Sequence, residues 1–324
     1  MKAAYMDRYG TPEVLTVRDI PAPKIGPNEV LIRQAASNVS PADCAFRSAD
    51  PFIVRFFTGL LRPTAPIPGE TVAGTIEAVG ADVTRFTPGD RVFGISELAM
   101  GALAELVGFP EDSAIVRMPE GLGFEEAGGL PYGYLTALPF LRDEAKLQPG
   151  QRILINGAAG SVGIVAVQLA RNMAAHVTAV CSTHNVELLL SLGADEVIDR
   201  TKLDFTSARA SYDVIFDAVG RSSFPACRAA LKPGGIYLTT VPTWAILWQM
   251  LRKGLPEGKR AKLATTGLRK PAAKRADMQL LAETIERGEV RGVIDEVFPL
   301  RRIADAHRYV ELGTKAGDVI ITIP

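Results

Sequence analysis

The sequence predicts an α/β protein in which a doubly wound parallel sheet follows a β-rich first third. Short alternating apolar runs, separated by proline and glycine turns, occupy 30–35, 72–79 and 90–94. From about Gly121, strand patterns alternate with helical patterns, which is typical of parallel sheets. At 324 residues the chain is long enough for two domains.

The elements of the second part follow one another as at least four strand–helix units. Strands are predicted at 152–156, 177–181, 196–198, 212–217 and 236–240, and helices at 162–172, 186–192 and 224–231. After them, helices are predicted at 278–287 and 303–311, and strands at 295–299 and 318–323. We expect this last part to return and complete the first domain.

Charge, hydropathy and cysteine usage limit the function classes. Lys plus Arg equals Asp plus Glu at 36 each, so no net field favours nucleic acid, and we expect no nucleic-acid partner. No apolar run of about 18 residues is present to span a bilayer. The start lacks a secretory signal pattern, and three scattered cysteines indicate a reducing, cytoplasmic setting.

The stretch LINGAAGSVGIVAVQLARN (154–172) places a glycine turn between a strand and a helix, as in a Rossmann fingerprint. Gly157 allows the tight turn, Gly160 lets a pyrophosphate approach, and Gly163 lets the helix pack on the strand. The candidate cofactor contacts are Gly157, Ala159, Gly160, Ser161, Val162 and Gly163. The alternative is a corner whose small residues serve only packing.

The end of the second strand of this sheet predicts the type of cofactor. Enzymes that bind NAD place an acid there, about 20 residues after the turn, to bind the ribose 2′-hydroxyl. Here the candidates are Ser182, Thr183, His184 and Asn185, with no carboxylate among them. These groups can donate hydrogen bonds to a 2′-phosphate, which favours NADPH over NADH. In the alternative, Ser182 and Thr183 cap the helix that begins near Val186, and both roles can coexist.

Several motifs together resemble the medium-chain dehydrogenase/reductase superfamily, in particular its zinc-free quinone oxidoreductase branch. They are MKAAYMDRYGTPEVL (1–15), PKIGPNEV (23–30), the stretch 35–47, PGETVAGTIEAVG (68–80), FTPGDRVFG (86–94), LTAL (135–138), the glycine turn, CSTHN (181–185) and LGADEVID (192–199). The resemblance covers essentially the whole chain.

The resemblance implies a GroES-like β-barrel catalytic domain, formed by 1–121 and 263–324, around a Rossmann NADP-binding domain at 122–262. A cleft between them would bind substrate, and we expect a homodimer. It also implies further cofactor contacts at Thr136, Asp217, Val219, Gly220, Thr240, Val241 and Pro242.

The resemblance also bears on zinc. Zinc-dependent relatives bind their catalytic metal with a cysteine, a His-Glu pair and a second cysteine. The matching positions here hold Ser40, then Glu70 with Thr71, then Tyr132, and residues 91–130 contain no cysteine for a structural zinc lobe. We therefore expect no metal. Without a Lewis acid, quinones and α,β-unsaturated carbonyls suit the site better than unactivated aldehydes.

Tyr132, Ser40 and Glu70 are the candidate catalytic residues. Many zinc-free relatives carry an apolar residue at the position of Tyr132 and an asparagine at that of Ser40. Our hypothesis is that Tyr132 donates a hydrogen bond or a proton to the substrate oxygen, with Ser40 and Glu70 in the same polar patch. Alternatively, Tyr132 packs at the domain seam with its hydroxyl bonded to backbone. For Asp43, a structural role in a turn is the favoured interpretation.

Two apolar segments, 51–61 and 242–251, predict the walls of a pocket for a small apolar or aromatic carbonyl or quinone. Ordinary buried helices or a dimer contact would explain them too. A basic stretch follows at 252–275, which is typical of a solvated loop and also compatible with contact to an anionic membrane surface or an acidic partner.

The sequence thus predicts a zinc-independent, NADPH-dependent reductase of quinones or α,β-unsaturated carbonyls. One alternative is an NADP-dependent alcohol or aldehyde dehydrogenase. Another, from a different class, is a regulatory or interaction protein that binds NADPH without turnover.

Overall fold

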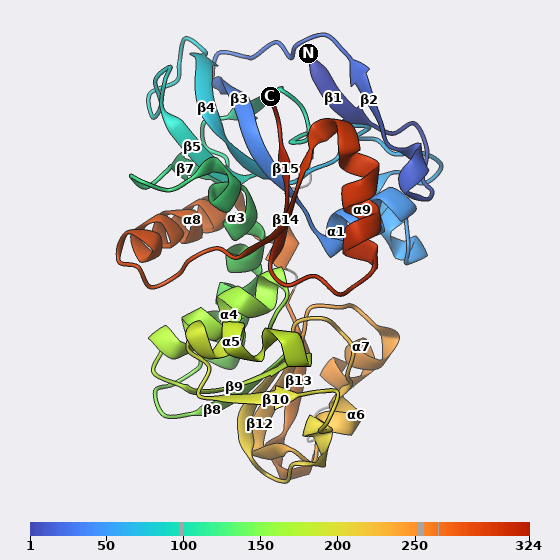
Figure 1. Cartoon of the computed structure of the whole chain (residues 1–324), viewed down its shortest axis with the longest axis vertical. Helices are drawn as coiled ribbons and strands as arrows, with labels where there is room; N and C mark the ends of the chain where they lie inside the picture. Colours follow the sequence, from blue (N-terminus) through green and yellow to red (C-terminus); the bar gives the residue numbers. More distant parts are fainter. Residues whose placement is uncertain (97–99, 252–255, 265) are drawn as a thin grey trace. The chain divides into compact units, whose positions relative to one another are not determined.

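The computed structural model describes residues 1–96, 100–251, 256–264 and 266–324. The chain forms two compact units, shown in Figure 1. Unit 1 comprises Met1–Tyr132 and Arg269–Pro324, and unit 2 comprises Gly133–Leu268. Helix α3 (Phe124–Pro139) begins in unit 1 and ends in unit 2. Within the described residues, no helix is both long enough and apolar enough to cross a bilayer.

Unit 2 contains a six-stranded parallel sheet with the order β10-β9-β8-β11-β12-β13. Its strands are β8 (Arg152–Asn156), β9 (His176–Cys181), β10 (Glu196–Asp199), β11 (Tyr212–Asp217), β12 (Leu231–Thr239) and β13 (Arg260–Leu263). The helices between them are α4 (Ser161–Asn172), α5 (Val186–Ser191), α6 (Phe224–Cys227) and α7 (Trp244–Leu251). The chain reverses direction across the sheet between β8 and β11, where doubly wound folds bind their ligands. The predicted fold class is confirmed.

The helix predicted at 224–231 is too long, because α6 ends at Cys227. Leu231 is fully buried and pairs with Tyr212 as the first residue of β12. Pro233 lacks an amide hydrogen and Gly234 has a φ of +75°, so this segment cannot extend a helix. Residues 232–235 form an irregularity within β12.

Unit 1 is built on a sheet with the order β14-β15-β3-β4-β5-β7, and β6 also pairs with β3. Its strands are β3 (Glu29–Val39), β4 (Thr71–Val79), β5 (Arg91–Ile95), β6 (Leu106–Pro110), β7 (Ile115–Arg117), β14 (Ile294–Pro299) and β15 (Asp318–Thr322). A separate pair is formed by β1 (Lys2–Tyr5) and β2 (Thr16–Asp19). The helices are α1 (Pro41–Ser48), α2 (Arg55–Thr58), the start of α3, α8 (Pro271–Glu286) and α9 (Ile303–Glu311).

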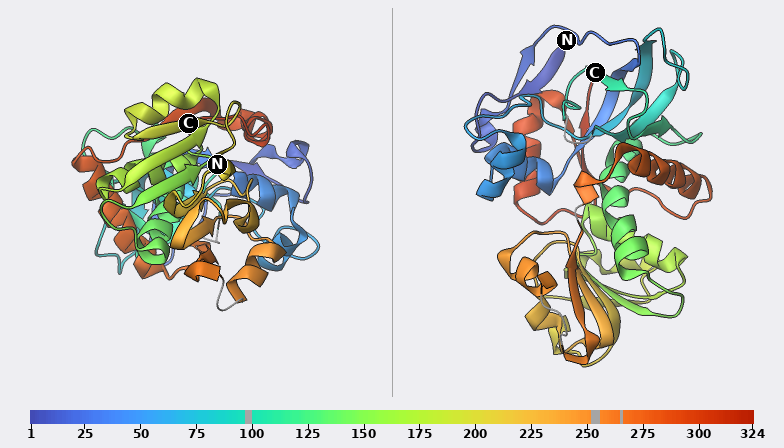
Figure 2. Two further views of the ribbon diagram at one scale, coloured as in Figure 1. Left: turned by 90° about the horizontal axis from the view of Figure 1, so that it is seen from below. Right: turned by 180° about the vertical axis from the view of Figure 1, so that it is seen from behind.

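The return of the last segment to unit 1 is a pairing between strands. β15 runs antiparallel to β3, with Val319 opposite Val39, and both views in Figure 2 show the red and blue segments together. One hydrophobic core combines Ala4, Val39 and Leu103 from the first segment with residues of β14, α9 and β15 from the second. Burial of such side chains stabilises each by about 1.5–3 kcal/mol. The core therefore depends on both segments.

Candidate functional site

A buried polar cluster in unit 1 begins at the junction of β3 and α1. Ser40 is the N-cap of α1, and Asp43 occupies the third helical position. The Ser40 hydroxyl accepts the Asp43 amide at 3.1 Å and donates to Asp43 Oδ2 at 2.6 Å. The same Oδ2 accepts the Ser40 amide at 2.8 Å. This is a capping box, and both residues are fully buried.

Glu70 enters the cluster from the start of β4, which pairs with β3. Its carbonyl accepts the Ser96 amide at 2.6 Å. Thr71, the next residue, accepts the Asn38 amide at 2.8 Å and donates to Asn38 Oδ1 at 3.0 Å. The resemblance matches Glu70 and Thr71 to the His-Glu pair of zinc-dependent relatives. The chain thus has one carboxyl group there, and the neighbouring Thr71 hydroxyl is hydrogen-bonded to Asn38 of β3.

Tyr132 reaches the cluster from α3, and its side chain is hydrogen-bonded to the Ser40 side chain. Tyr132 also lies within electrostatic range of Glu70 and Asp43. The structure therefore brings Tyr132, Ser40 and Glu70 together. One partner of Tyr132 is thus a side chain of this cluster.

Burial sets the proton affinities of the cluster. It raises the pKa of Glu70 to about 8, with the Asp43 charge acting in the same direction and the Lys274 charge opposing. Burial also raises the pKa of Asp43 to about 6, against hydrogen bonds from Ser40. It raises the pKa of Tyr132 well above its ordinary value, and Glu70 and Asp43 contribute. The cluster thus retains protons at neutral pH that isolated carboxyl groups would release.

Lys274 and Asp318 are polar residues of this region that the sequence did not reveal. Lys274, on α8, is 4% exposed, and its charge acts on Glu70. Asp318, at the start of β15, acts on Tyr132. A Cβ added to Gly129 of α3 would lie 2.7 Å from Asp318 Oδ2, so glycine allows this close approach. Both residues are far from Tyr132 in the chain, and no local pattern marks them.

In unit 2, the glycine turn joins β8 to α4, and its three glycines have different roles. Gly157 has a φ of +76°, and a Cβ there would lie 2.4 Å from Val219 Cγ1. A Cβ on Gly163 would lie 2.3 Å from the Gly157 carbonyl oxygen. A Cβ on Gly160 would meet only that oxygen, at an ordinary 3.5 Å. Packing therefore explains Gly157 and Gly163 but not Gly160.

Gly160 is the N-cap of α4, and among the described residues no side chain caps this helix. The first turn is made of small or apolar residues, namely Ser161, Val162 and Gly163, after Ala158 and Ala159. Backbone amides and the helix dipole at such an end favour an anion. These residues fit a dinucleotide pyrophosphate.

The other predicted cofactor residues lie at the carboxyl ends of β11 and β12 or on α3. Val219 and Val241 are 39% and 38% exposed, and a Cβ on Gly220 would lie 2.4 Å from Val241. The Thr240 hydroxyl donates to the Ala218 carbonyl at 3.1 Å. Pro242 is exposed beyond them, and Thr136 is half-buried on the second half of α3.

Asp217 is fully buried. It accepts hydrogen bonds from Asn156 Nδ2 and the Tyr237 hydroxyl, both at 2.9 Å, and from the Ser222 amide at 2.8 Å. These bonds connect β8, β11 and β12. Asp217 thus orders the loop that carries Val219.

Residues 182–185 contain no carboxylate, but the structure brings one to the end of β9 from the neighbouring strand. β10 pairs with β9 so that Asp199 lies opposite Cys181, and Asp199 Oδ2 accepts the Thr183 hydroxyl at 2.7 Å. This carboxylate also pairs with Lys202 at 3.1 Å. Hydrogen bonds from Thr201 and Thr183 hold its pKa well below its ordinary value. The acid was missed because it arrives from the neighbouring strand.

Arg200 follows Asp199, and its Nε donates to the Ser182 hydroxyl at 3.1 Å. The short helix at Thr183–Asn185 and α5 have no side-chain cap among the described residues, so the capping alternative for Ser182 and Thr183 is wrong. His184 is exposed and Asn185 is buried. The edge therefore combines hydroxyls, two cations and one paired carboxylate.

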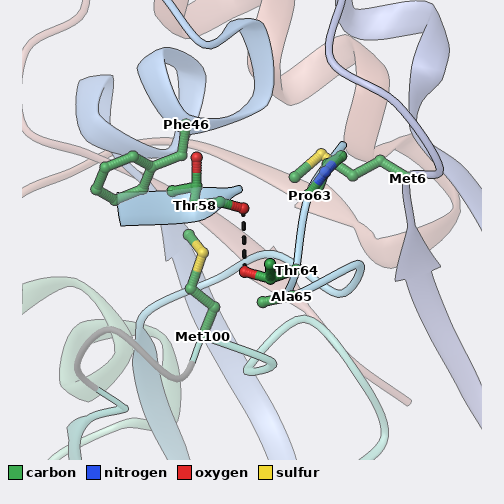
Figure 3. Close-up of a pocket in the computed structure, with 7 residues that line it drawn as sticks. All are labelled: Met6, Phe46, Thr58, Pro63, Thr64, Ala65 and Met100. Carbon is green, nitrogen blue, oxygen red and sulfur yellow. Dashed lines mark hydrogen bonds between the residues drawn. The ribbon is translucent and has the colours of Figure 1, made fainter. Parts of the chain in front are cut away.

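The two apolar segments each line a hollow in their own unit. In unit 1, Thr58 borders a small opening lined by Met6, Phe46, Thr58, Pro63, Thr64, Ala65 and Met100, as Figure 3 shows. In unit 2, α7 borders a second small opening beside Gly220 and Val241. Phe56, Trp244 and Trp248 are more than two-thirds exposed. Neither segment is an ordinary buried helix.

The basic stretch is not simply a solvated loop. It contains β13 and the start of α8. Lys262 pairs with Glu144 at 2.6 Å, Arg269 with Asp277 at 2.5 Å, and Lys259 with Glu257 at 2.5 Å. Arg252 and Lys253 lie outside the described residues. Among the described residues, no group of three or more His, Cys, Asp or Glu side chains is placed to bind a metal ion.

Comparison with known families matches both parts of the chain. A family described as "Alcohol dehydrogenase GroES-like domain" matches residues 26–120. A family described as "Zinc-binding dehydrogenase" matches residues 192–321.

Individual relatives extend over the whole length. A 2-methylene-furan-3-one reductase from Solanum lycopersicum is 33% identical, over 99% of this chain and 79% of its own. An NADPH-dependent alkenal/one oxidoreductase of Arabidopsis thaliana chloroplasts is 32% identical, with the same coverage. The solved quinone oxidoreductase of Coxiella burnetii is 28% identical, with a TM-score of 0.87 over 100% of this chain and 99% of its own.

Proposed function

Because this chain is an NAD(P)H-dependent oxidoreductase of the medium-chain dehydrogenase/reductase superfamily, in its zinc-free quinone oxidoreductase-like branch, we propose that it reduces quinones or α,β-unsaturated carbonyl compounds with NADPH. The observation that supports this proposal is the Tyr132–Ser40–Glu70 cluster, at positions that the resemblance matches to the zinc ligands of related enzymes. It offers proton donors where a metal would offer a Lewis acid.

NADPH would be held by the residues of unit 2 described above. The start of α4 with Gly160 suits the pyrophosphate, and Arg200, Ser182 and Lys202 suit a 2′-phosphate. Asp199, which would attract a 2′-hydroxyl, is already bonded to Thr183 and Lys202. When bound, NADPH supplies the hydride.

Residues of this chain would stabilise the negative charge that develops on the substrate during reduction. In the proposed mechanism, Tyr132 donates a hydrogen bond to the substrate oxygen, where negative charge develops as the conjugated system is reduced. Burial keeps Tyr132 and Glu70 protonated at neutral pH, so both remain available as acids. The exposed apolar side chains Phe56, Trp244 and Trp248 would suit contact with a small apolar or aromatic substrate.

We propose that the enzyme works without zinc. Ser40, Thr71 and Tyr132 offer hydroxyl groups, which are weaker ligands than the cysteine and histidine that zinc prefers. All three are engaged in hydrogen bonds within unit 1. Metal analysis of the active protein should find less than one zinc per chain, and a chelator should leave turnover unchanged.

The assembly and compartment are further proposals. β13 is an edge strand that pairs with β12 alone among the described strands of its sheet, and such an edge can pair with that of a second copy. The three cysteines are free and buried, as suits a reducing cytoplasm. Sedimentation of the purified protein would show whether it is a homodimer.

A substrate panel tests the proposed function. NADPH oxidation should be rapid with a quinone and with an enone, and much slower with a saturated aldehyde. Turnover of saturated aldehydes or alcohols alone would favour the alcohol dehydrogenase alternative. Tight NADPH binding without oxidation by any electrophile would favour a regulatory protein.

Tyr132→Phe tests the role of the hydroxyl. We expect kcat to fall about 10²-fold, at the lower end of what general acid catalysis contributes, with little change in NADPH affinity. Unchanged turnover with every accepted substrate would rule out the role of Tyr132.

A further inference from the structure

The hydrogen bonds of Ser40 determine the direction in which Tyr132 donates. A serine hydroxyl has one hydrogen to donate and two lone pairs to accept. Ser40 donates its hydrogen to Asp43 Oδ2, at 2.6 Å, and accepts the Asp43 amide, at 3.1 Å. Toward Tyr132, Ser40 can therefore only accept. While Asp43 is ionised, the Tyr132 hydrogen is committed to Ser40 and cannot be donated to a substrate.

Protonation of Asp43 reverses the direction of the hydrogen bonds that run from Tyr132 through Ser40 to Asp43, and no heavy atom needs to move. A proton on Asp43 Oδ2 is donated to Ser40, which turns its own hydrogen toward Tyr132. The Tyr132 hydrogen is then released for a substrate oxygen. The same three oxygens thus have a closed and an open arrangement, selected by one proton on Asp43.

Two further observations indicate that Asp43 does more than cap a helix. It is fully buried, whereas a capping box ordinarily lies at the surface. Its Oδ1 is also buried and has no hydrogen-bond partner within the part of the chain that the structure describes. An unpaired buried carboxylate oxygen is costly, and protonation lowers that cost.

We propose that Asp43 and Glu70 together hold one exchangeable proton behind Tyr132, and that Ser40 passes it to Tyr132 when Tyr132 protonates the reduced substrate. This inference rests on the proposed function and deepens it. Tyr132 is the catalytic residue that contacts substrate, whereas Ser40 and Asp43 act through it as positioning and proton-transfer residues.

The transfer balances without any further reactant. After hydride addition, the substrate is an enolate or a quinol anion. The Tyr132 O–H bond breaks as a bond forms to the substrate, the Ser40 hydrogen moves to Tyr132, and the Asp43 proton moves to Ser40. Asp43 is left as a carboxylate, so the negative charge has moved from substrate to Asp43. A proton from water restores the starting state.

The charged groups around Asp43 and Glu70 predict the pH range in which these two carboxyl groups hold one proton. Asp43 raises the proton affinity of Glu70, Lys274 lowers it, and Tyr132 lies near both, with Asp318 acting on Tyr132. The pKa of Asp43 is raised to about 6 and that of Glu70 to about 8. Two like charges held together titrate as a pair, so the pair carries about one proton between pH 6 and 8. Because the open arrangement requires that proton to be on Asp43, turnover should begin to fall as pH rises above about 6 and should be lost above about 8.

Variants at Ser40 separate proton transfer from helix capping. Ser40→Thr retains both the hydroxyl and the cap, whereas Ser40→Asn retains a cap but has no hydroxyl. Ser40→Thr should keep kcat within about threefold of wild type. Ser40→Asn should lower kcat about 10²-fold and remove its decline at high pH. Equal kcat and equal pH profiles for the two variants would overturn the proposal.

Asp43→Asn tests the proton source, with Asp204→Asn as its matched control. Asp204 accepts the amide and hydroxyl of Thr206 at 2.9 and 2.8 Å, much as Asp43 accepts those of Ser40, but lies in unit 2. We expect Asp43→Asn to lower kcat about 10²-fold and Asp204→Asn to leave it unchanged. Wild-type kcat in Asp43→Asn would overturn the proposal.

Infrared spectroscopy of the protein without substrate keeps this inference distinct from the proposed function. At pH 7 the carbonyl stretch of a protonated carboxylic acid should be present in wild type and absent from the Asp43→Asn/Glu70→Gln double variant. Absence of the difference band would overturn the inference even if the enzyme reduces enones. Presence of the band without NADPH oxidation by any electrophile would refute the proposed function and, with it, the role of the proton in turnover.

Discussion

The resemblance matches Ser40 to the position at which zinc-dependent relatives place a cysteine, and Ser40 offers a hydroxyl there that both accepts and donates. Because the hydroxyl also caps α1, its oxygen is fixed relative to Asp43 by two hydrogen bonds. A thiol offers weaker hydrogen bonds at the same place. This hydroxyl suits the proton transfer that we propose.

Glu70 should make folding stability depend on pH. Its pKa is raised from about 4.5 to about 8 in the folded protein, chiefly by burial. Over this interval the unfolded chain has released the Glu70 proton, whereas the folded protein still holds it. The contribution of Glu70 to stability is therefore greatest at low pH and falls toward pH 8. Glu70→Gln should flatten this fall in denaturant titrations at pH 5 and 8.

Glu77→Gln is the matched control for this measurement. Glu77 is partly exposed, and its hydrogen bond to Arg33 lowers its pKa, which is the opposite shift. This variant should leave the fall between pH 5 and 8 in place. The prediction fails if Glu70→Gln and wild type lose the same stability over that interval.

Arg200 should set the preference for NADPH. A charged hydrogen bond to phosphate contributes about 1.5–3 kcal/mol, or roughly 10- to 150-fold in affinity. Arg200→Met should weaken NADPH binding by that factor and leave NADH binding within about twofold, as measured by cofactor fluorescence. Arg209→Met, an exposed arginine bonded only to backbone carbonyls, is the control. Equal loss for both cofactors would contradict the assignment.

The residues of the polar cluster differ in how far the sequence reveals them. Ser40, Glu70 and Tyr132 could be located because motifs flank each of them. Asp43 was visible, but the capping pattern Ser-x-x-Asp explains it equally well as a structural residue. Lys274, Asp318 and Asp199 reach their sites through tertiary packing or the neighbouring strand, and no local spacing encodes such contacts.

At the scale of elements, the turn between β8 and α4 contains one glycine that folding requires and another that cofactor binding would require. A Cβ on Gly163 would overlap the Gly157 carbonyl oxygen at 2.3 Å and Ala158 Cα at 2.6 Å, and backbone atoms cannot move aside cheaply. Gly163→Ala should lower the free energy of unfolding by about 1–3 kcal/mol. Denaturant titration measures this loss.

Gly160→Ala should show the opposite balance. Its Cβ has room at 3.5 Å, so unfolding should change by at most about 1 kcal/mol, the cost of a poorer N-cap. The methyl group would occupy the close approach that a pyrophosphate needs, and NADPH affinity should fall at least tenfold. Wild-type affinity in Gly160→Ala would show that the pyrophosphate is bound elsewhere.

Elements with a clear apolar period could be predicted closely, and those governed by tertiary contacts could not. β8, β11 and α9 have the predicted limits, because buried runs and turn residues delimit them. β13 was hidden in a basic stretch, since its cations are paired within unit 2 and β12 supplies the backbone partner. The predicted length of α6 was too great, because the apolar Leu231 and its neighbours fit a strand as well as the continuation of a helix.

At the scale of the whole molecule, the two units should behave as two cooperative regions. Ile321 and Ile155 are both fully buried, in β15 of unit 1 and β8 of unit 2. Each substitution by alanine should cost about 2–5 kcal/mol. In hydrogen exchange, Ile321→Ala should lower protection at 1–132 as well as 269–324, and Ile155→Ala should lower it within 133–268. The same protection changes for both variants would show a single cooperative unit.

The pairing of β15 with β3 has a consequence for synthesis on the ribosome. Residues 133–268 are translated before 269–324, so all strands of unit 2 are available while β3 still lacks β15. During that interval the Val39 end of β3 presents an unpaired edge and an incomplete apolar core to other nascent chains. The order of translation therefore makes unit 1, the part that holds the proton-transfer cluster, the one that depends most on protection by chaperones.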